Sequence, residues 1–346
     1  MAANTERKWY QLNGREGDVV ISTRIRLARN LAGHPFPASM TDDQRREVCA
    51  LVKDAVQSRC AHAGEFSYMD MDQMPQREAL SMVERHLISP DFAKGQAGSA
   101  LLLTKDESIS LMVCEEDHVR LQVMRPGLML DEAYAQADML DTALDEQLHF
   151  AFDDRLGYLT QCPTNLGTGM RASLMLHLPA LEEKGVLNQL AKTVSKLGLT
   201  IRGMYGEGSG SKGAIYQLSN QVTLGISEQA ALDNLKGIAD QIIREERNAR
   251  KTLCEDIRFQ DRVWRSFGIL SNARTLSNDE AMALISNVLV GVSSGLMSSP
   301  TLEDIHTLIN DMQPATLMVA AGENLDPDKR DVLRANLARS VFRKGE

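Results

Sequence analysis

The chain has 346 residues, with 47 acidic and 38 basic side chains and a net charge of −9. This length exceeds the usual size of one domain, so we expect one large and one smaller domain, and the acidic balance argues against nucleic acid as the main partner. No apolar run approaches the roughly 20 residues that span a bilayer and the N-terminus lacks a signal-peptide core, which predicts a cytoplasmic protein without a membrane partner.

Two local patterns stand out in the first half of the chain. Apolar residues at helical spacing, preceded by a candidate capping box, predict a helix over residues 41–60. Apolar residues then alternate at period two over residues 109–113 and again over 119–123. This alternation predicts an antiparallel hairpin whose turn is the acidic stretch 115–118.

The following residues continue the mixture of helices and strands. Strands from distant parts of a chain, joined by hairpins and occasional helices, favour an α+β fold with a mostly antiparallel sheet flanked by helices. We assign this larger domain to residues 1–255. The further elements expected in it are a helix over 131–147, a loop around Cys162, a helix beginning near Arg171, strands over 199–202 and 215–224, and a helix over 231–243.

No strand pattern is convincing after about residue 255. Ser277 and Glu280 form another candidate capping box, and helical periodicity continues through Leu289. We therefore expect residues 256–346 to form a smaller, all-helical domain.

The most informative segment spans residues 162–173 and reads Cys-Pro-Thr-Asn-Leu-Gly-Thr-Gly-Met-Arg-Ala-Ser. It places a thiol, a loop with two glycines and an arginine in a row, which suits a pocket that holds a cationic acceptor beside a phosphate. The five cysteines of the chain are scattered, without the spacing of a zinc site or the density of a disulfide scaffold. An isolated Cys-Pro pair more often marks a buried thiol before a loop, so this interpretation needs support from other segments.

Five arginines give that support. An extended chain puts Arg24 and Arg26 on one face, and Arg120 and Arg202 occupy the polar faces of their own strands, while Arg171 follows the glycine loop. Taken singly, each is a solvated surface charge. If they converge, they form a cage for a nucleotide triphosphate, because arginine binds phosphate oxygens bidentately and stays charged when partly desolvated.

Acidic residues suited to a guanidinium acceptor lie in two segments. Glu116 occupies the predicted hairpin turn and Glu207 follows the strand that carries Arg202. A guanidinium arrives protonated, because its pKa is above about 12, and must lose a proton before its nitrogen can attack phosphorus. Two carboxylates can orient it and accept that proton, and a Cys162 thiolate would add a third negative contact.

A glycine-rich stretch over residues 208–213 matches the pattern G-x-G-x-x-G, which is weak by itself. A dinucleotide-binding fold requires a helix next, whereas residues 215–224 alternate like a strand. The chain also lacks the H-R-D and D-F-G sequences of protein kinases and the P-loop pattern. We interpret the stretch as a mobile loop able to close over the acceptor or the nucleotide.

With these residues assembled, the chain resembles the phosphagen (guanidino) kinases, and most closely the bacterial protein arginine kinases of the McsB type. The resemblance covers roughly residues 18–250. It rests on four motifs in the family's order, at residues 22–26, 115–120, 162–173 and 202–207.

The resemblance implies roles for individual residues. Glu116 and Glu207 are expected to hold and deprotonate the guanidinium, and Cys162 to contact it. His86 matches a nucleotide-contacting histidine of the family, although by itself it would be a histidine at a capped helix end. The implied nucleotide-binding residues are Ser22, Thr23, Arg24, Ile25, Arg26, His86, Arg120, Arg171, Ala172, Ser173, Leu174, Met175, Arg202, Gly203, Met204, Tyr205, Gly206 and Glu207.

Two departures separate the chain from kinases of small guanidino compounds, namely the short segment before the first arginine motif and a helical extension after residue 255, and Cys114 is a further, local difference. Those enzymes carry a helical domain before the first arginine motif, and only a short segment precedes it here. The more open site that this implies suits an arginine side chain presented on another protein. Cys114 stands where the family more often has asparagine before the paired glutamates, so the backbone-supporting hydrogen bond of that asparagine is not expected.

The helical extension contains Arg330, Asp331, Arg334 and Ala335, which match the R-D-x-x-R-A motif by which McsB-type enzymes bind phosphoarginine allosterically. On a helix the two arginines lie one turn apart and can share a phosphate, while the aspartate can meet the guanidinium part. Without the resemblance they would be two solvated like charges.

We therefore expect an ATP- and magnesium-dependent kinase of arginine side chains in proteins, with Mg²⁺ bridging phosphate oxygens through few direct protein ligands. One alternative is a kinase of free arginine or another small guanidine. Another is a non-catalytic reader of phosphoarginine, in which the arginines and glutamates of the site would be superfluous. The resemblance also implies a homodimer, a zinc-binding activator protein, a stress-gene repressor, a Clp protease complex, and a role in marking damaged proteins for degradation.

Overall fold

The computed structural model describes residues 7–203 and 211–343. An eight-stranded sheet lies at its centre, and each pair of neighbouring strands is antiparallel. In spatial order the strands are β2 (Phe66–Asp70), β3 (Ala100–Thr104), β4 (Ile109–Val113), β5 (Val119–Pro126), β1 (Val20–Arg29), β8 (Met170–His177), β10 (Ile215–Asn220) and β9 (Leu199–Gly203). The remaining strands, β6 (Phe152–Asp153) and β7 (Gly157–Tyr158), form a separate hairpin.

The α-helices of the described residues fall into a group around the sheet and a group after it. Around the sheet lie α1 (Asp42–Arg59), α2 (Gln76–Glu84), α3 (Leu130–Leu148), α4 (Pro179–Glu183), α5 (Leu187–Lys196) and α6 (Glu228–Glu255). After it come α7 (Ile257–Asn272), α8 (Asn278–Ser293), α9 (Leu302–Asp311), α10 (Pro314–Ala321) and α11 (Pro327–Phe342). Among the described residues, none of these helices combines the length and the apolar composition required to cross a membrane.

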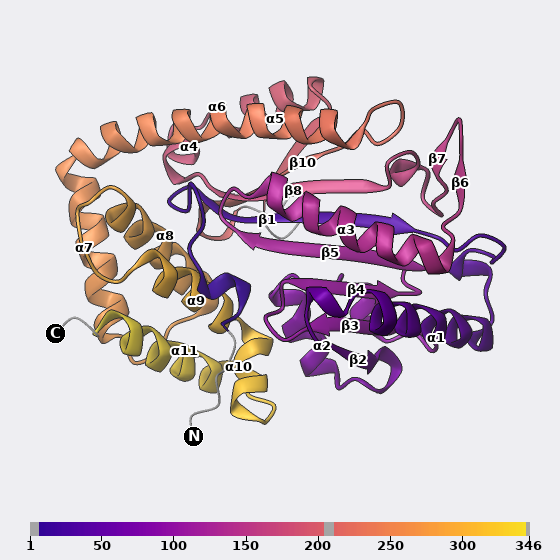
Figure 1. The fold of residues 1–346 in the computed structure, drawn as a ribbon. Coiled ribbons are helices and arrows are strands. Elements are labelled where there is room, and N and C mark those ends of the chain that lie inside the picture. The colour runs from indigo at the N-terminus through magenta and orange to yellow at the C-terminus, as the bar shows by residue number, and fades with distance from the viewer. Residues whose placement is uncertain (1–6, 204–210, 344–346) are drawn as a thin grey trace.

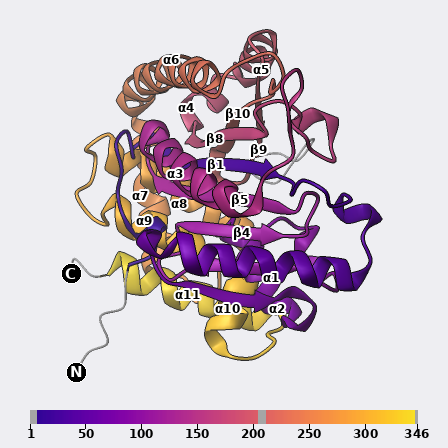
Figure 2. The same cartoon turned by 45° about the vertical axis from the view of Figure 1, so that its right-hand side comes forward.

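One face of the sheet is apolar and packs against α1, α3 and α6. Ile25 and Leu27 of β1 and Leu174 of β8 are almost fully buried in this core. Figures 1 and 2 show the molecule from two directions, and in both views α1 and α3 lie across the sheet. Because side chains alternate along a strand, the polar residues between these apolar ones point to the opposite face.

Apolar side chains cover parts of the opposite face. At the β2–β4 end, the segment after α2 packs Leu87 against Leu103 and Met112 in a small apolar cluster. At the other end, Met175 and Ile215 pack against the C-terminal helices. The polar side chains of the central strands lie between these two coverings.

The C-terminal helices form their own apolar core and are joined to the sheet by buried polar contacts. Arg250 of α6 donates to the carbonyl oxygen of His177 at 2.7 Å and to Ser293 Oγ at 2.9 Å. His177 Nε2 lies 2.8 Å from Ser286 Oγ of α8. Since buried polar groups require such partners, these contacts fix how α8 sits against the end of β8.

The structure confirms the α+β class, the antiparallel sheet with flanking helices and the helical C-terminal region. The hairpin with the acidic turn and the helices near residues 41–60, 131–147 and 231–243 are also confirmed, the last being longer than expected. The predicted strand over 215–224 ends at Asn220.

The helix expected to begin near Arg171 is wrong, because this residue lies in β8. The segment has a period of two: Arg171 is only partly buried, whereas Ala172 and Leu174 are in the core. It also pairs with β1 on one side and β10 on the other. These ladder hydrogen bonds and the burial of one face outweigh local helix propensity.

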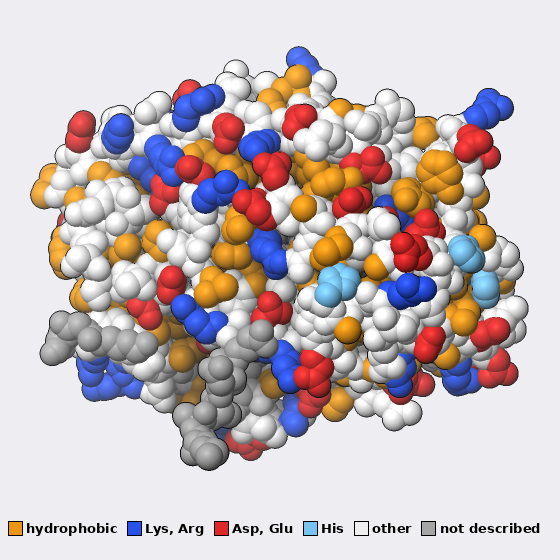
Figure 3. Space-filling model, viewed as in Figure 1, with side chains coloured by type: hydrophobic (Ala, Val, Ile, Leu, Met, Phe, Trp, Pro, Cys, Tyr) orange, Lys and Arg blue, Asp and Glu red, His pale blue; other side chains and the backbone are white. Residues whose placement is uncertain are grey.

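The surface carries both charges in a mixed arrangement. Figure 3 shows Lys and Arg side chains interspersed with Asp and Glu over the face that carries α1 and α3. This face therefore lacks the continuous basic stripe that phosphate-backbone binding requires.

Candidate active site

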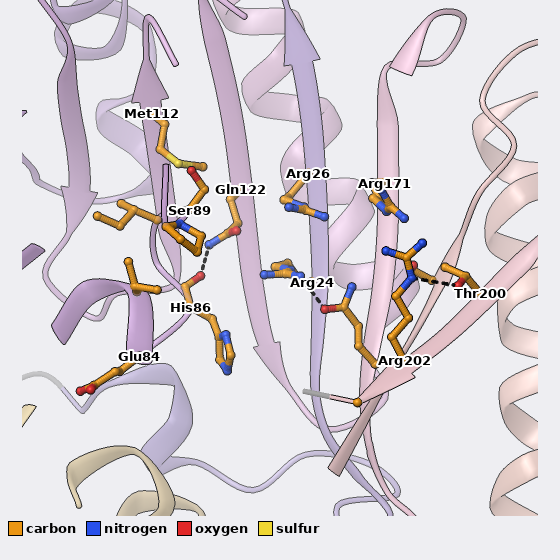
Figure 4. A pocket seen from close by; sticks show the side chains of 16 residues that line it. Arg24, Arg26, Glu84, His86, Ser89, Met112, Gln122, Arg171, Thr200 and Arg202 are labelled. Atoms are coloured by element: carbon orange, nitrogen blue, oxygen red, sulfur yellow. Dashed lines mark hydrogen bonds between the residues drawn. The ribbon is translucent and has the colours of Figure 1, made fainter. Parts of the chain in front are cut away.

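A cavity of about 410 Å³ opens on the polar face of the sheet. Arg24 and Arg26 of β1, Arg171 of β8 and Arg202 of β9 all line it, and Figure 4 shows these side chains gathered above the strands. Its other lining residues are Val83, Glu84, His86, Ile88, Ser89, Pro90, Met112, Gln122, Thr200, Gly203, Gln217 and Ser219.

Strand register brings these arginines together. Arg26 lies directly opposite Arg171 on β8, and Arg24 lies opposite Ser173. Two strands further, Arg202 lies opposite Gln217. Since residues that face each other across antiparallel strands point to the same side of the sheet, these four arginines from three strands share one surface.

The cluster is electrostatically unfavourable without an anion. Burial, followed by the charges of Arg171 and Arg120, lowers the pKa of Arg24 to about 10. Burial and the neighbouring arginines, Arg24 first, also lower the pKa of Arg26 well below its usual value. For Arg171 the causes of the lowered pKa are burial, then Arg202 and Arg120. Each shift shows that the surroundings disfavour the charged form.

Some guanidinium donors of the cluster have partners and others do not. Arg24 donates to Gln217 Oε1 at 3.0 Å and to Ser173 Oγ at 3.3 Å. The Nε atoms of Arg26 and Arg171 are buried and have no hydrogen-bond partner within the described part of the chain. Because unpaired buried donors are costly, these two atoms fit an anionic ligand with several oxygen acceptors, such as a polyphosphate.

Arg120 is engaged by two carboxylates in this structure. Its Nη1 lies 2.8 Å from Glu115 Oε2, and its Nη2 lies 2.7 Å from Glu116 Oε2. The Glu116 side chain is 37% exposed, whereas that of Glu115 is 9% exposed. Glu116 is therefore the carboxylate that an acceptor from solution can reach.

Glu115 also links the acidic turn to the cavity. Ser89, which lines the cavity, donates to Glu115 Oε1 at 2.6 Å. Sequence analysis included Glu115 in a motif but gave it no role. The signal that could have identified it is the paired glutamates immediately before a strand that carries an arginine.

Cys162 lies beside the acidic turn rather than in the lining of the cavity. It is partly buried, and its Sγ is 3.0 Å from Thr164 Oγ1. Asn165, three residues further, donates to Glu116 Oε2 at 3.4 Å. The thiol and the exposed carboxylate therefore belong to neighbouring segments, as an acceptor site requires.

Asp117 connects the acidic turn with the segment that carries Cys162. Its Oδ1 accepts hydrogen bonds from Asn30 Nδ2 at 2.7 Å and from the backbone N–H of Gln161 at 2.8 Å. Asn30 in turn accepts from the N–H of His118 at 2.9 Å. Cys114, where the family more often has asparagine, adopts a positive φ of 57° and its N–H donates to the carbonyl of His118 at 2.9 Å, so the turn remains closed.

His86 lines the nucleotide side of the cavity. It has a positive φ of 61°, and Gln122 Nε2 donates to its carbonyl oxygen at 2.8 Å. Burial, and then the charge of Arg24, lowers the pKa of His86 to about 4. The imidazole is therefore neutral at physiological pH and can accept or donate a hydrogen bond without adding positive charge to the arginine cluster.

Several predicted nucleotide-binding residues do not line the cavity with their side chains. Thr23 is buried, donates to the Gly127 carbonyl at 2.6 Å and accepts from the Met129 N–H at 3.0 Å. Ser22 is also buried. The side chains of Ile25, Ala172 and Leu174 lie in the main core and that of Met175 in the C-terminal core, which leaves their backbone atoms for ligand contacts.

The predicted residues Met204, Tyr205, Gly206 and Glu207 lie outside the described residues, as do residues 208–210 of the glycine stretch 208–213. Gly203, which precedes them, lines the cavity. Within residues 7–203 and 211–343, no group of three or more His, Cys, Asp or Glu side chains could hold a metal ion.

The predicted phosphoarginine motif lies in α11 and its two arginines differ. Arg334 is 1% exposed and donates to the carbonyl oxygens of Met312 at 3.0 Å and Leu276 at 2.8 Å, besides pairing with Asp331. Arg330 is only partly buried, and Ala335 is buried beneath the helix. In this structure Arg334 joins α11 to the helices beside it.

The fold and the site can be compared with known proteins. Residues 47–249 match the family described as ATP:guanido phosphotransferase, C-terminal catalytic domain, and residues 256–346 match the protein-arginine kinase McsB C-terminal domain. The chain is 44% identical to a protein-arginine kinase of Brevibacillus brevis, over 98% of this chain and 96% of that protein. It is also 44% identical to a protein-arginine kinase of Moorella thermoacetica, over 99% of each chain.

Solved structures give the same answer for the fold. A duplicated taurocyamine kinase from Schistosoma mansoni, with bound transition-state-analogue components, matches at a TM-score of 0.60 and 29% identity, over 67% of this chain and 33% of that chain. This chain thus spans about a third of that duplicated protein. A lombricine kinase matches at a TM-score of 0.60 and 24% identity, over 70% and 69% of the two chains, which supports the fold alone. The chain is therefore a guanidino phosphotransferase that uses ATP, and it belongs to the protein-arginine kinase family.

Proposed function

We propose that this chain transfers the γ-phosphoryl group of ATP to the guanidinium of arginine side chains in proteins. The observation that carries the proposal is the arginine cavity beside two carboxylates. Among the described residues, the buried Nε atoms of Arg26 and Arg171 have no hydrogen-bond partner. Ser89 of the cavity lining donates to Glu115, and Arg120 pairs with both Glu115 and Glu116. The names of the full-length relatives support arginine in proteins as the acceptor.

In the proposed reaction the arginines bind the triphosphate and stabilise the negative charge on the transferred phosphoryl group. Phosphoryl transfer depends mainly on positioning and on such charge stabilisation. Glu116 orients the acceptor guanidinium and accepts its proton, so that a nitrogen lone pair can attack the γ-phosphorus as the bond to ADP breaks. We keep Glu207 as the second carboxylate and Cys162 as a contact of the acceptor.

Arg120 has a double role in this proposal. In the ligand-free protein it neutralises Glu115 and Glu116, and it also lowers the pKa of Arg24 by its charge. When the triphosphate is bound, its guanidinium can turn to the phosphate oxygens. The Glu116 carboxylate is then free to receive a cationic acceptor.

Magnesium remains part of the proposal as a companion of the nucleotide. The described residues provide no dedicated cluster of metal ligands, so they do not fit a protein-held metal site. We therefore assign no step of the reaction to a metal bound by these side chains.

The test is incubation of the purified chain with ATP and either an unfolded, arginine-containing protein or free arginine. The products are analysed by mass spectrometry under non-acidic conditions, which preserve the labile P–N bond. We expect phosphate on arginine side chains of the protein. Phosphate found mainly on free arginine would replace the proposal by the alternative that the taurocyamine kinase likeness favours, a kinase of a small guanidine.

We also propose the cellular setting that the family resemblance implies: a cytoplasmic homodimer that marks damaged proteins or a stress-gene repressor for a Clp protease complex and responds to a zinc-binding activator protein. The support is the nearly full-length similarity to protein-arginine kinases. Molecular mass in solution and co-purification with these partners are the measurements that test it.

A further inference from the structure

Glu84, the last residue of α2, lies between the cavity and the C-terminal helical region. The residue lines the nucleotide cavity, two positions before His86. Figure 4 shows its carboxylate pointing away from Arg24 and Arg26. The group therefore serves something other than the triphosphate.

The carboxylate binds the N-terminus of α10 in the C-terminal helical region. Its Oε1 accepts from the N–H of Ala315 at 2.9 Å, and its Oε2 accepts from the N–H of Thr316 at 2.8 Å and from the Thr316 hydroxyl at 3.1 Å. Gln313, the residue at the N-cap position, makes no side-chain capping bond, and Pro314 has no N–H. Glu84 thus satisfies the helix donors that a local capping residue usually satisfies.

The segment between Glu84 and the cavity is fixed on its other side by the sheet. Gln122 of β5 donates to the His86 carbonyl at 2.8 Å, and Ser110 of β4 donates to the Leu87 carbonyl at 2.9 Å. The turn that presents His86 therefore lies between two anchors, the sheet and α10.

The segment just before α10 also contacts Arg334 of the motif in α11. Arg334 donates to the carbonyl oxygen of Met312, two residues before Pro314, and also to the carbonyl oxygen of Leu276. The hydrogen bond of Arg334 to Met312, the backbone from Met312 to Thr316 and the hydrogen bonds of Ala315 and Thr316 to Glu84 thus connect the α11 motif with the nucleotide segment.

We propose that Glu84 is a positioning residue for ATP, which joins the N-terminus of α10 to residues 84–90 and so makes nucleotide affinity depend on the packing of the C-terminal helical region. The inference rests on the proposed nucleotide site. Without the carboxylate, the segment is released from α10 and spends only part of its time in the binding-competent position, which weakens apparent affinity by that fraction. The chemical step changes little, because Glu84 does not face the reacting phosphate.

The chain offers a matched control on the same pair of helices. Arg77, near the start of α2, donates to the Gly322 carbonyl at the C-terminal end of α10 at 3.0 Å. Its substitution breaks another contact between α2 and α10 but leaves residues 84–90 anchored. Arg77 is absent from the lining of the cavity.

The experiment measures ATP dissociation constants by titration calorimetry and separately measures kcat and KM for ATP, using the full chain. For Glu84→Ala we expect binding about tenfold weaker, the scale of a lost helix cap, with kcat within about twofold of wild type at saturating ATP. Glu84→Gln keeps one acceptor oxygen and is expected to fall between wild type and Glu84→Ala. For Arg77→Ala we expect ATP binding within about twofold of wild type.

Unchanged ATP affinity in Glu84→Ala, or an equal loss in Arg77→Ala, would overturn the inference. If Glu84→Ala does not fold, Glu84→Gln decides, and wild-type affinity in that variant would overturn it as well. Because the calorimetric test uses no acceptor, it does not depend on which guanidine is phosphorylated. A wild-type chain that does not bind ATP would instead overturn the proposed function together with this inference.

Discussion

Arg26 and Arg171 face each other across β1 and β8, and the Nε atom of each is buried without a hydrogen-bond partner among the described residues. Burial disfavours the charged form of both side chains, and the charge of Arg171 adds to this cost at Arg26, where the charge of Glu115 offsets only part of it. A bound polyphosphate supplies both the missing charge and the missing acceptors. In the proposed function, nucleotide binding would therefore relieve an electrostatic cost that the folded protein carries at these two residues.

The first prediction concerns Arg26→Gln. We expect kcat/KM for ATP to fall roughly 10- to 100-fold, because a charged hydrogen bond to phosphate is lost. We also expect the ligand-free variant to unfold at a higher temperature than wild type, because a buried like charge has been removed. Initial rates at varied ATP concentration measure the first effect, and thermal unfolding with and without ATP measures the second. Arg155→Gln, at an exposed position, is the control for charge. A full ATP-induced stabilisation in Arg26→Gln would contradict the role.

Glu116→Gln separates the acceptor side of the site from the nucleotide side. We expect kcat to fall by about 100-fold or more, because the amide cannot take the proton of the guanidinium. ATP binding should be retained or improved, since Arg120 loses one of its two carboxylate partners. Single-turnover rates and nucleotide titrations test this, and a parallel loss of ATP affinity would show that Glu116 supports the nucleotide instead.

The buried histidines His118, His177 and His306 have lowered pKa values and contribute to the pH dependence of stability, and so does His86, whose pKa is lowered from 6.5 to about 4. As the pH falls from 6.5 towards 4, the unfolded chain binds a proton at this histidine and the folded chain does not, so the free energy of unfolding decreases in this window, by about 1 kcal/mol per pH unit. His86→Asn, which tolerates the positive φ, should reduce this decrease. Urea unfolding between pH 4 and 7 is the measurement, and His62→Gln, at an exposed position, is the control; equal pH profiles for His86→Asn and wild type would contradict the prediction.

The two arginines of the α11 motif should respond differently to substitution. Arg334→Ala leaves the Met312 and Leu276 carbonyls and Asp331 without their partner, and we expect a loss of about 3 kcal/mol in the free energy of unfolding. Arg330→Ala should change it by no more than about 0.5 kcal/mol. Equal losses of stability in chemical denaturation would contradict this difference.

Arg330→Ala therefore tests the predicted phosphoarginine site without the complication of lost stability. We expect the variant to keep its basal phosphoryl transfer and to show a weaker response to added phosphoarginine. Initial rates over a range of phosphoarginine concentrations measure this. An unchanged response would remove Arg330 from the proposed site.

Much of the site could be predicted because strand periodicity is local. The alternation around Arg24 and Arg26 already separates the apolar face of β1 from the polar one, and the acidic turn with Glu116 follows from the two flanking strand patterns. Local periodicity is not sufficient at Arg171, where a glycine loop followed by a short segment predicts a helix start but the residue lies in β8. Pairing of β8 with two neighbours, which local sequence does not specify, decided the outcome.

Other features required the three-dimensional structure because they are long-range contacts between side chains with no shared local pattern. Glu115 and Glu116 both pair with Arg120 and would compete with a phosphate for its guanidinium. A sequence motif alone does not reveal this competition. The contact of Glu84 with Ala315 and Thr316 joins residues more than 200 positions apart. Nothing in the sequence near Glu84 distinguishes it from an ordinary exposed helix-end glutamate.

By itself, the sequence determined the chemistry of this protein: arginines for a polyphosphate, carboxylates for a guanidinium, and the residues of each strand that face away from the core. Those properties depend on residue type and on the short periods of helices and strands. Only the tertiary structure decided which of these residues meet, because strand order and register place Arg24, Arg26, Arg171 and Arg202 on one surface while Thr23 and Ile25, from the same motif, are buried. The physical reason is that burial of the apolar face and completion of the backbone hydrogen bonds fix the register over the whole sheet, and no local segment carries that information.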